Sequence, residues 1–257
     1  MIRGYIMKDV DIYNKSIQKQ ELDMLIEVDK ICKKSNLKYF LGYGTVLGAI
    51  RHKGFIPWDT DIDILVEIDH YKQFCETIYK NIDSKYELKS IDTDPIYDSL
   101  KARVCLKGQL HNLIHIDIFP MVGSPKSTIM KKIFSKISYL NYRCYFVKKV
   151  NPNINYSNNK KKRILAFIAK FLLLPIPANI FVKIFYKLST LYSITESNYL
   201  YNICGSYGLK EFIPKEWFEE TIYADFEGYK FPIPKEWDKY LTHIYGDCMT
   251  PKKQNYV

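Results

Sequence analysis

One stretch, residues 41–66, constrains the fold more than any other part of the chain. It begins as a short apolar strand that leads into a Gly-Tyr-Gly-Thr turn, continues as a helix, and ends in a strand where aspartate and isoleucine alternate. Successive side chains of a strand point to opposite faces, so Asp61 and Asp63 share one face while Ile62 and Ile64 enter the core. The chain therefore needs a sheet with an acidic patch on one face and a helix that begins beside it.

A second alternating strand is predicted at residues 113–119, where Asp117 stands between two isoleucines. It brings a third carboxylate to the same sheet. Clustered carboxylates repel one another unless a cation lies between them, and Mg²⁺ held by carboxylates and substrate phosphates is the usual solution. We therefore predict a Mg²⁺ site, with Mn²⁺ as a substitute ion, in which Asp61, Asp63 and Asp117 are ligands and catalytic acids. Asp117 is also the candidate for accepting the proton of an attacking hydroxyl.

The glycine turn supplies what a phosphate group needs. Gly44 allows close backbone approach, and the free N–H groups at the start of a helix over residues 45–52 attract anions. The Thr45 hydroxyl is expected to cap that helix. A GT turn or an Asp-x-Asp strand alone is more often an ordinary turn or a solvated face. The order strand, turn, helix, acidic strand and later acidic strand is the nucleotidyltransferase arrangement, so Gly44 and Thr45 are predicted to cradle a diphosphate.

The remaining patterns predict an α+β fold: a nucleotidyltransferase-like mixed sheet with flanking helices and a basic helical insertion. We divide the chain into a catalytic core (1–125), the insertion (126–195) and a C-terminal segment that completes the domain (196–257). Expected helices cover residues 16–34, 69–82, 127–147, 160–173, 179–191 and 235–245. Expected strands cover residues 38–42, 61–67, 86–91, 99–106 and 113–119, with an aromatic hairpin over 223–231 that turns at 227–228.

The net charge of +10 is concentrated in the insertion. Between Asp117 and Glu196 there are 14 Lys and Arg residues and no acidic residue, interleaved with apolar runs such as residues 164–168 and 171–174. This mixture is typical of helices that lie in the headgroup plane of an anionic membrane, so we predict peripheral membrane contact over residues 126–187. The alternative is a helical subdomain that packs on the core and whose lysines are only solvated.

The cysteines and the N-terminal residues indicate a reducing compartment. The six cysteines are scattered without a Cys-x-x-Cys pair, and residues 1–10 contain no apolar core of a signal peptide. The most apolar stretch, residues 164–185, is interrupted by lysines and prolines, so no membrane span is expected. We therefore predict a cytoplasmic protein, at most peripheral at the inner face of the plasma membrane.

Three segments carry a family resemblance. GTVLGAIRHKGFIPWDTDIDI (44–64), HIDIFP (115–120) and FEGYKFPIPKEWDKYLTHIYGDCM (226–249) resemble the LicD family of phosphocholine transferases, which are related to fukutin and fukutin-related protein. Thr60 interrupts the run of acids that usually follows the tryptophan, so the role of Asp59 stays open. The chain after Asp247 is shorter and more basic than is typical of the family.

The resemblance implies transfer of a phospho-alcohol, most simply phosphocholine from CDP-choline, to a sugar hydroxyl with release of CMP. The expected acceptor is a cell-surface glycan, such as a lipopolysaccharide or teichoic acid precursor, which can be lipid-linked. Positive charge for the transferring phosphoryl group would come from Arg51, Lys53, Lys101 and Arg103. Of these Arg103 is favoured, because it shares with Lys101 one face of a predicted strand that leads towards the Asp117 strand. Nucleic acid is not an expected partner.

Two other functions use the same residues. A true nucleotidyltransferase acting on RNA or on a small-molecule hydroxyl would release pyrophosphate instead of CMP. A non-catalytic module for anionic lipid or glycan would keep the fold without the chemistry. The three acids argue against such a module, because a protein without chemistry does not need clustered carboxylates.

Overall fold

A computed structural model describes residues 2–94, 96–109, 114–150 and 160–250. These residues form a mixed α+β fold, as predicted, built on one seven-stranded sheet and a separate two-stranded hairpin. The helices are α1 (Ile2–Ser35), α2 (Tyr43–Arg51), α3 (Ile68–Asn81), α4 (Thr128–Lys149), α5 (Lys160–Leu172), α6 (Ala178–Ser189) and α7 (Trp237–Tyr245), with short 3₁₀ turns η1 (Gly208–Glu211) and η2 (Lys215–Phe218). The strands are β1 (Phe40–Leu41), β2 (Ile62–Glu67), β3 (Tyr86–Lys89), β4 (Ala102–Leu106), β5 (His115–Gly123), β6 (Tyr199–Asn202), β7 (Phe212–Pro214), β8 (Thr221–Phe226) and β9 (Tyr229–Pro234).

Strand β5 lies at the centre of the large sheet. The strand order is β1-β2-β5-β4-β3, and β6 pairs with the far end of β5 and carries β7. Strands β2 and β5 run parallel, whereas the other pairs are antiparallel. A parallel pair needs a crossover connection, which here consists of α3, β3 and β4. The predicted mixed sheet is therefore confirmed.

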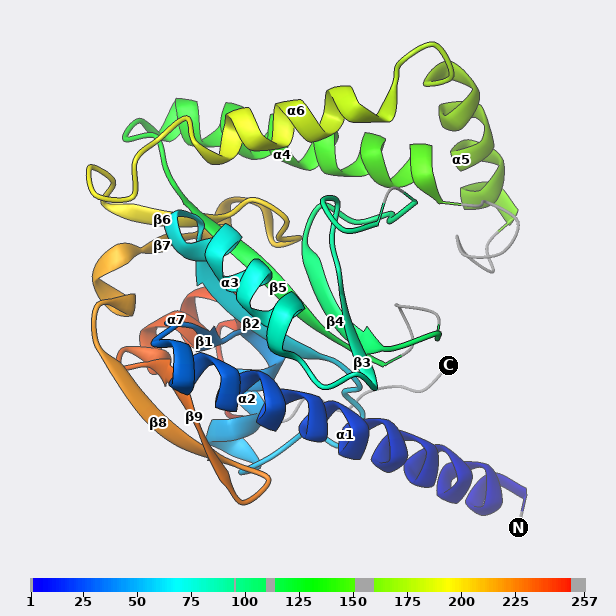
Figure 1. Cartoon of the computed structure of the whole chain (residues 1–257), viewed down its shortest axis with the longest axis vertical. Coiled ribbons are helices and arrows are strands. Elements are labelled where there is room, and N and C mark those ends of the chain that lie inside the picture. The colour runs from blue at the N-terminus through cyan, green and yellow to red at the C-terminus, as the bar shows by residue number, and fades with distance from the viewer. Residues whose placement is uncertain (1, 95, 110–113, 151–159, 251–257) are drawn as a thin grey trace.

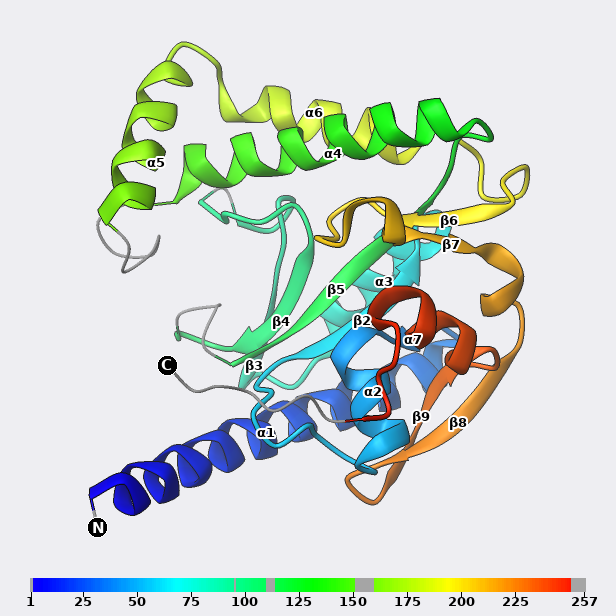
Figure 2. The same cartoon turned by 180° about the vertical axis from the view of Figure 1, so that it is seen from behind.

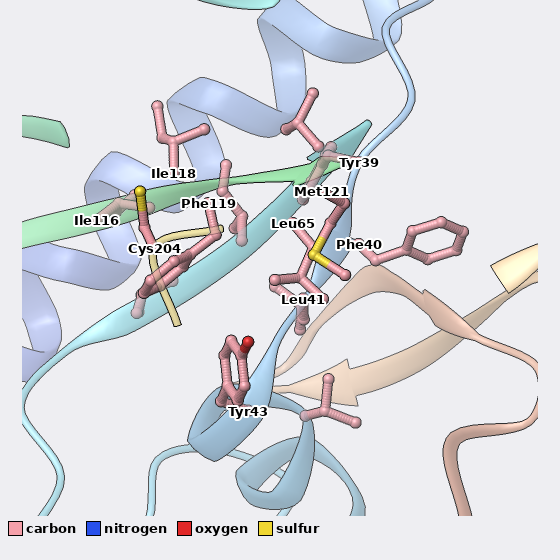
Figure 3. Packing of buried hydrophobic residues seen from close by; sticks show 14 of the residues in the cluster. Tyr39, Phe40, Leu41, Tyr43, Leu65, Ile116, Ile118, Phe119, Met121 and Cys204 are labelled. Atoms are coloured by element: carbon pink, nitrogen blue, oxygen red, sulfur yellow. The ribbon is translucent and has the colours of Figure 1, made fainter. Parts of the chain in front are cut away.

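The helices cover both faces of this sheet. Helices α1 and α3 lie on one face, and α2 and α7 lie on the other (Figures 1 and 2). Successive side chains of β5 point to opposite faces of the sheet, as Ile118 and Phe119 show (Figure 3). All nine residues of β5 are buried. A strand buried on both faces gives the polar side chains that it carries a rigid, water-poor setting.

Helices α4, α5 and α6 are inserted between β5 and β6 of the same sheet. Helix α4 packs along α6 at one end of the molecule, and α5 connects the two (Figure 1). The three-part division of the chain stays a prediction, although the pairing of β5 with β6 joins residues on both sides of the insertion. No helix within the described ranges has both the length and the apolar composition that crossing a membrane requires.

Several element boundaries differ from those expected. Helix α1 begins at Ile2 instead of residue 16, and β1 has two residues instead of five. Strands β6 and β7 were not predicted, because each is only three or four residues long and shows no alternation. The hairpin turn at Glu227 and Gly228 is confirmed, with φ angles of 50° and 80°. Residue 113, at the start of the predicted second acidic strand, lies outside the described residues.

Candidate active site

The register of three strands brings the predicted acids together. Asp63 on β2 is opposite Asp117 on β5, and Asp117 is opposite Arg103 on β4. A pocket of about 390 Å³ opens over these strands. Its lining comes from seven segments of the chain: Tyr43, Gly44, Asp59, Asp61, Asp63, Lys101, Asp117, Phe119, Tyr142, Cys204, Gly205, Ser206, Tyr207, Glu211 and Tyr245.

The turn before α2 is fastened directly to the acidic strand. The Gly42 N–H donates to the Asp63 carbonyl at 2.8 Å, and the Asp63 N–H donates to the Thr45 hydroxyl at 2.9 Å. Thr45 was expected to cap the helix, but it does not. Gly42 is the N-cap residue, and no side chain caps α2. The hydroxyl was predicted to bind a helix N–H, but the neighbouring strand offers an unpaired N–H instead. The result is that α2 and Asp63 keep a fixed relative position.

Gly44 is required by the close approach of Asp59. A Cβ atom at position 44 would lie 2.6 Å from Asp59 Oδ2. The carbonyl of Asp59 also accepts a hydrogen bond of 2.8 Å from the Gln18 side chain of α1. Asp59, whose role the sequence left open, is thus held in the pocket wall beside the turn.

The acids of the pocket raise one another's pKa values. Burial and the neighbouring Asp61 raise the pKa of Asp63 well above its usual range and raise the pKa of Asp59 to about 8. Burial and Asp61 also raise the pKa of Glu21, on α1, to about 9. Glu21 is fully buried, and neither of its carboxylate oxygens has a hydrogen-bond partner among the described residues. A cation bound in the pocket would relieve the repulsion among Asp59, Asp61 and Asp63, whereas Glu21 does not line the pocket.

The residues present fit Mg²⁺ in its usual coordination. Within the described ranges no three His, Cys, Asp or Glu side chains form a complete metal cage. Mg²⁺ rarely uses such a cage, because it keeps several waters and is commonly held by one or two carboxylates and the phosphates of the substrate. Asp61 and Asp63 are the carboxylates available for that arrangement.

Asp117 is engaged by two cations. Arg103 Nε lies 2.6 Å from Asp117 Oδ1, and Lys101 Nζ donates to Asp117 Oδ2. Burial alone would raise the pKa of Asp117, but Lys101 and Arg103 outweigh it and hold the pKa well below its usual range. Lys101 also lies 3.9 Å from the ring centre of Phe119. The structure thus presents Asp117 as an ionised partner of two buried cations.

The predicted site residues fall into two groups. Gly44, Asp61, Asp63 and Asp117 line the pocket together, whereas Thr45, Arg51 and Arg103 do not contribute to its lining. Arg103 lies directly behind Asp117, and Arg51 donates from Nη1 to the Cys248 carbonyl at 2.5 Å. The ligand-binding roles of all seven residues stay predictions.

The opposite wall contains residues that the sequence analysis missed. Glu211 is fully buried, accepts a hydrogen bond from the Tyr43 hydroxyl, and accepts another from the Tyr207 N–H at 2.9 Å. The Asn202 amide donates to the same Tyr43 hydroxyl at 2.6 Å. Nothing in the sequence around Glu211 marks it. Glu21 could have been found, because it lies on the apolar face of α1 at helical spacing from Leu25, where an acid is out of place.

Glu211 gives a prediction on pH dependence. Burial raises its pKa from 4.5 to about 7. The folded state therefore holds the proton more tightly than the unfolded state, and stability falls as the pH rises from about 4.5 through 7. Glu211→Gln removes this titration. The difference in the free energy of unfolding between the variant and the wild type is therefore expected to shift in favour of the variant by about 3 kcal/mol as the pH rises through that window. Urea denaturation of both proteins on either side of the window checks this; parallel pH profiles would contradict it.

Aromatic rings make up much of the pocket wall beside the acids. Tyr43 stacks on Tyr207 with ring centres 5.8 Å apart and meets Phe119 edge-on at 5.5 Å. Tyr207 in turn contacts Tyr245 edge-on at 5.6 Å. The pocket thus combines anionic oxygens, one buried ammonium group and several aromatic rings.

Comparison with known proteins agrees with these features. The profile of the family described as "LicD/FKTN/FKRP, nucleotidyltransferase domain" matches residues 36–158. The lipopolysaccharide cholinephosphotransferase LicD of Haemophilus influenzae is 29% identical to this chain over 240 residues, which are 89% of this chain and 88% of that protein. These two matches support a member of the LicD family. They indicate a transferase, and the resemblance seen in the sequence motifs is confirmed.

Two further matches cover a smaller part of the chain. Uncharacterized proteins of Rickettsia prowazekii and Rickettsia typhi are each 44% identical to it over 41 residues, 16% of this chain. The matched length is 15% of the first protein and 13% of the second.

Proposed function

We propose that this LicD-family transferase moves a phospho-alcohol from a CDP-activated donor to a sugar hydroxyl of a cell-surface glycan and releases CMP. The donor we favour is CDP-choline, because the relative from Haemophilus influenzae, which aligns over most of the chain, is described as a lipopolysaccharide cholinephosphotransferase. The observation that carries the proposal is one pocket in which Asp61 and Asp63 face the buried pair of Lys101 and Asp117.

In this proposal each wall of the pocket has a separate task. Asp61 and Asp63 hold Mg²⁺, which neutralises charge on the donor diphosphate when bound. Lys101 lines the pocket and places positive charge near the transferring phosphoryl group, where charge develops in the transition state. Asp117 keeps Lys101 and Arg103 in position through its two ion pairs. Its predicted action as a proton acceptor is disfavoured by the same pairs, because they stabilise the ionised carboxylate.

The aromatic wall supports choline as the alcohol. A quaternary ammonium group binds the faces of aromatic rings and gains nothing from hydrogen-bond donors. The pocket offers Tyr207 and Tyr245 within the same lining as the acids. A small polyol such as glycerol or ribitol carries no positive charge and would gain no cation–π attraction from these rings.

A donor screen tests the proposed reaction. CDP-choline, CDP-ethanolamine, CDP-ribitol and CDP-glycerol are each incubated with the protein, Mg²⁺ and a glycan acceptor, and CMP release is measured. We expect the highest rate with CDP-choline and transfer of the label on choline to the acceptor. A parallel reaction with CTP tests the nucleotidyltransferase alternative, which the description of the matching family profile keeps open. Pyrophosphate release from CTP without CMP release from any CDP-alcohol would overturn the proposal.

A further inference from the structure

Helix α4 exposes a row of apolar side chains. The side of α4 that faces the protein is mixed, because it buries Ser135, Ser138 and Asn141 together with Phe134, Tyr145 and Val147. The exposed side carries Ile129, Ile133, Ile137 and Leu140, of which Ile129 is 70% exposed. At ~100° per residue these four side chains fall on one face of the helix. A helix whose outer face meets only water carries polar side chains on that face.

Helix α5 repeats this arrangement more strongly. Its buried described side chain is the small Ala166, whereas Phe167 and Phe171 are 62% and 67% exposed. The other exposed apolar side chains of α5 are Ile164, Leu165, Ile168 and Leu172. Contiguous apolar surface of this kind on a soluble domain marks an interaction site. Because α4 packs on α6 and α5 joins them, these residues belong to one end of the molecule (Figure 2).

The charge of the same helices specifies what kind of partner fits. Lys132 and Lys136 are exposed on α4 beside the isoleucines, and Lys183 and Lys187 are exposed on α6. No acidic residue occurs between Asp117 and Glu196. A protein partner that covered the isoleucines would also have to neutralise the positive charge of these lysines. A bilayer with anionic lipids accommodates both kinds of side chain, because its acyl chains contact the apolar residues and its headgroups contact the basic ones.

We propose that the exposed faces of α4, α5 and α6 form a docking surface for an anionic lipid bilayer. Phe167, Phe171 and the α4 isoleucines enter the boundary between headgroups and acyl chains, and the lysines contact the lipid phosphates. This inference does not depend on the reaction proposed above, because it concerns a different face of the chain from the pocket residues.

Co-sedimentation with vesicles tests the docking surface. The full-length protein is mixed with phosphatidylglycerol–phosphatidylcholine vesicles or with phosphatidylcholine vesicles, each at low and high salt. We expect binding to the anionic vesicles that weakens with salt, and at least about tenfold weaker binding to the neutral ones. Equal binding to both kinds, or binding to neither, would overturn the proposal.

Two pairs of variants locate the contact. Phe167→Ser with Phe171→Ser removes apolar anchors, and its control is Tyr223→Ser with Tyr229→Ser on the β8–β9 hairpin, where both tyrosines are similarly exposed. Lys132→Glu with Lys136→Glu reverses charge, and its control is Lys80→Glu with Lys230→Glu, which are exposed elsewhere.

Each variant of the helices is expected to weaken vesicle binding about tenfold or more, while its control stays within about twofold. Unchanged vesicle binding by the Phe167→Ser, Phe171→Ser variant would show that the attraction is electrostatic only, and it would overturn the insertion of α5 into the bilayer. Sedimentation velocity without lipid tests whether a second copy of the chain binds this face instead. A dimer that the Phe167→Ser and Phe171→Ser changes dissociate would assign this face to a second copy and also overturn the proposal.

Discussion

Asp61→Asn and Asp63→Asn are each expected to lower the rate of transfer by about 10³-fold or more, while the protein stays folded. Each change removes a carboxylate that would hold the proposed Mg²⁺ ion beside the donor diphosphate. Neither change removes a core contact, since the aliphatic neighbours Ile62 and Ile64 fill the core. The measurement is CMP release at saturating donor and Mg²⁺, beside a thermal melt of the metal-free protein.

The melt distinguishes a lost ligand from a damaged fold. Burial and Asp61 raise the pKa of Asp63, so the two carboxylates destabilise the metal-free protein at neutral pH. Neutralising either one is expected to leave the melting temperature unchanged or to raise it. Asp225→Asn, in the exposed part of β8, is the matched control and is expected to keep full activity. Full activity of Asp63→Asn, or of the wild type in excess EDTA, would remove the metal from the account.

The second large effect is on stability. Lys101→Met is expected to lower the free energy of unfolding by about 3–5 kcal/mol, because it leaves part of a buried ion pair uncompensated. The Lys101 and Asp117 side chains are 10% and 5% exposed, so water cannot replace the lost partner. Urea unfolding at neutral pH measures the change.

Matched variants separate charge from shape at this position. Lys101→Arg keeps the charge and is expected to recover a substantial part of the lost stability, although the larger group must fit beside Arg103. Lys230→Met, on the exposed part of β9, is expected to stay within about 0.5 kcal/mol of wild type. A loss for Lys101→Met as small as that for Lys230→Met would show that the ion pair contributes no net stability.

Much of the fold and of the acidic site followed from local sequence patterns. Alternation placed Asp61 and Asp63 on one face, and the register of β2 with β5 puts Asp117 opposite Asp63, as expected for the strand that carries the third acid. The shared face of Lys101 and Arg103 was also visible in the sequence, and both residues contact Asp117. These features need only the period of a strand and the pairing of neighbouring strands.

What could not be predicted depends on contacts between distant segments. The Thr45 hydroxyl was expected to cap α2, but it accepts the Asp63 N–H 18 residues away. Glu211 ends the 3₁₀ turn η1 between β6 and β7, two strands that are too short to show a period. Its side chain meets Tyr43 across 168 residues. Local propensity carries no information about such pairings, because they form only when the sheet assembles.

The measurement that tests the central claim most directly is the affinity for CDP-choline with and without Mg²⁺, determined by titration calorimetry for the wild type and for Asp63→Asn. The account predicts that Mg²⁺ strengthens binding of CDP-choline to the wild type by about tenfold or more, because Asp61 and Asp63 would hold an ion that neutralises charge on the diphosphate. In Asp63→Asn this gain is expected to disappear. Equal affinity with and without Mg²⁺ in the wild type, or an undiminished gain in Asp63→Asn, would contradict a metal-assisted donor site at these two carboxylates.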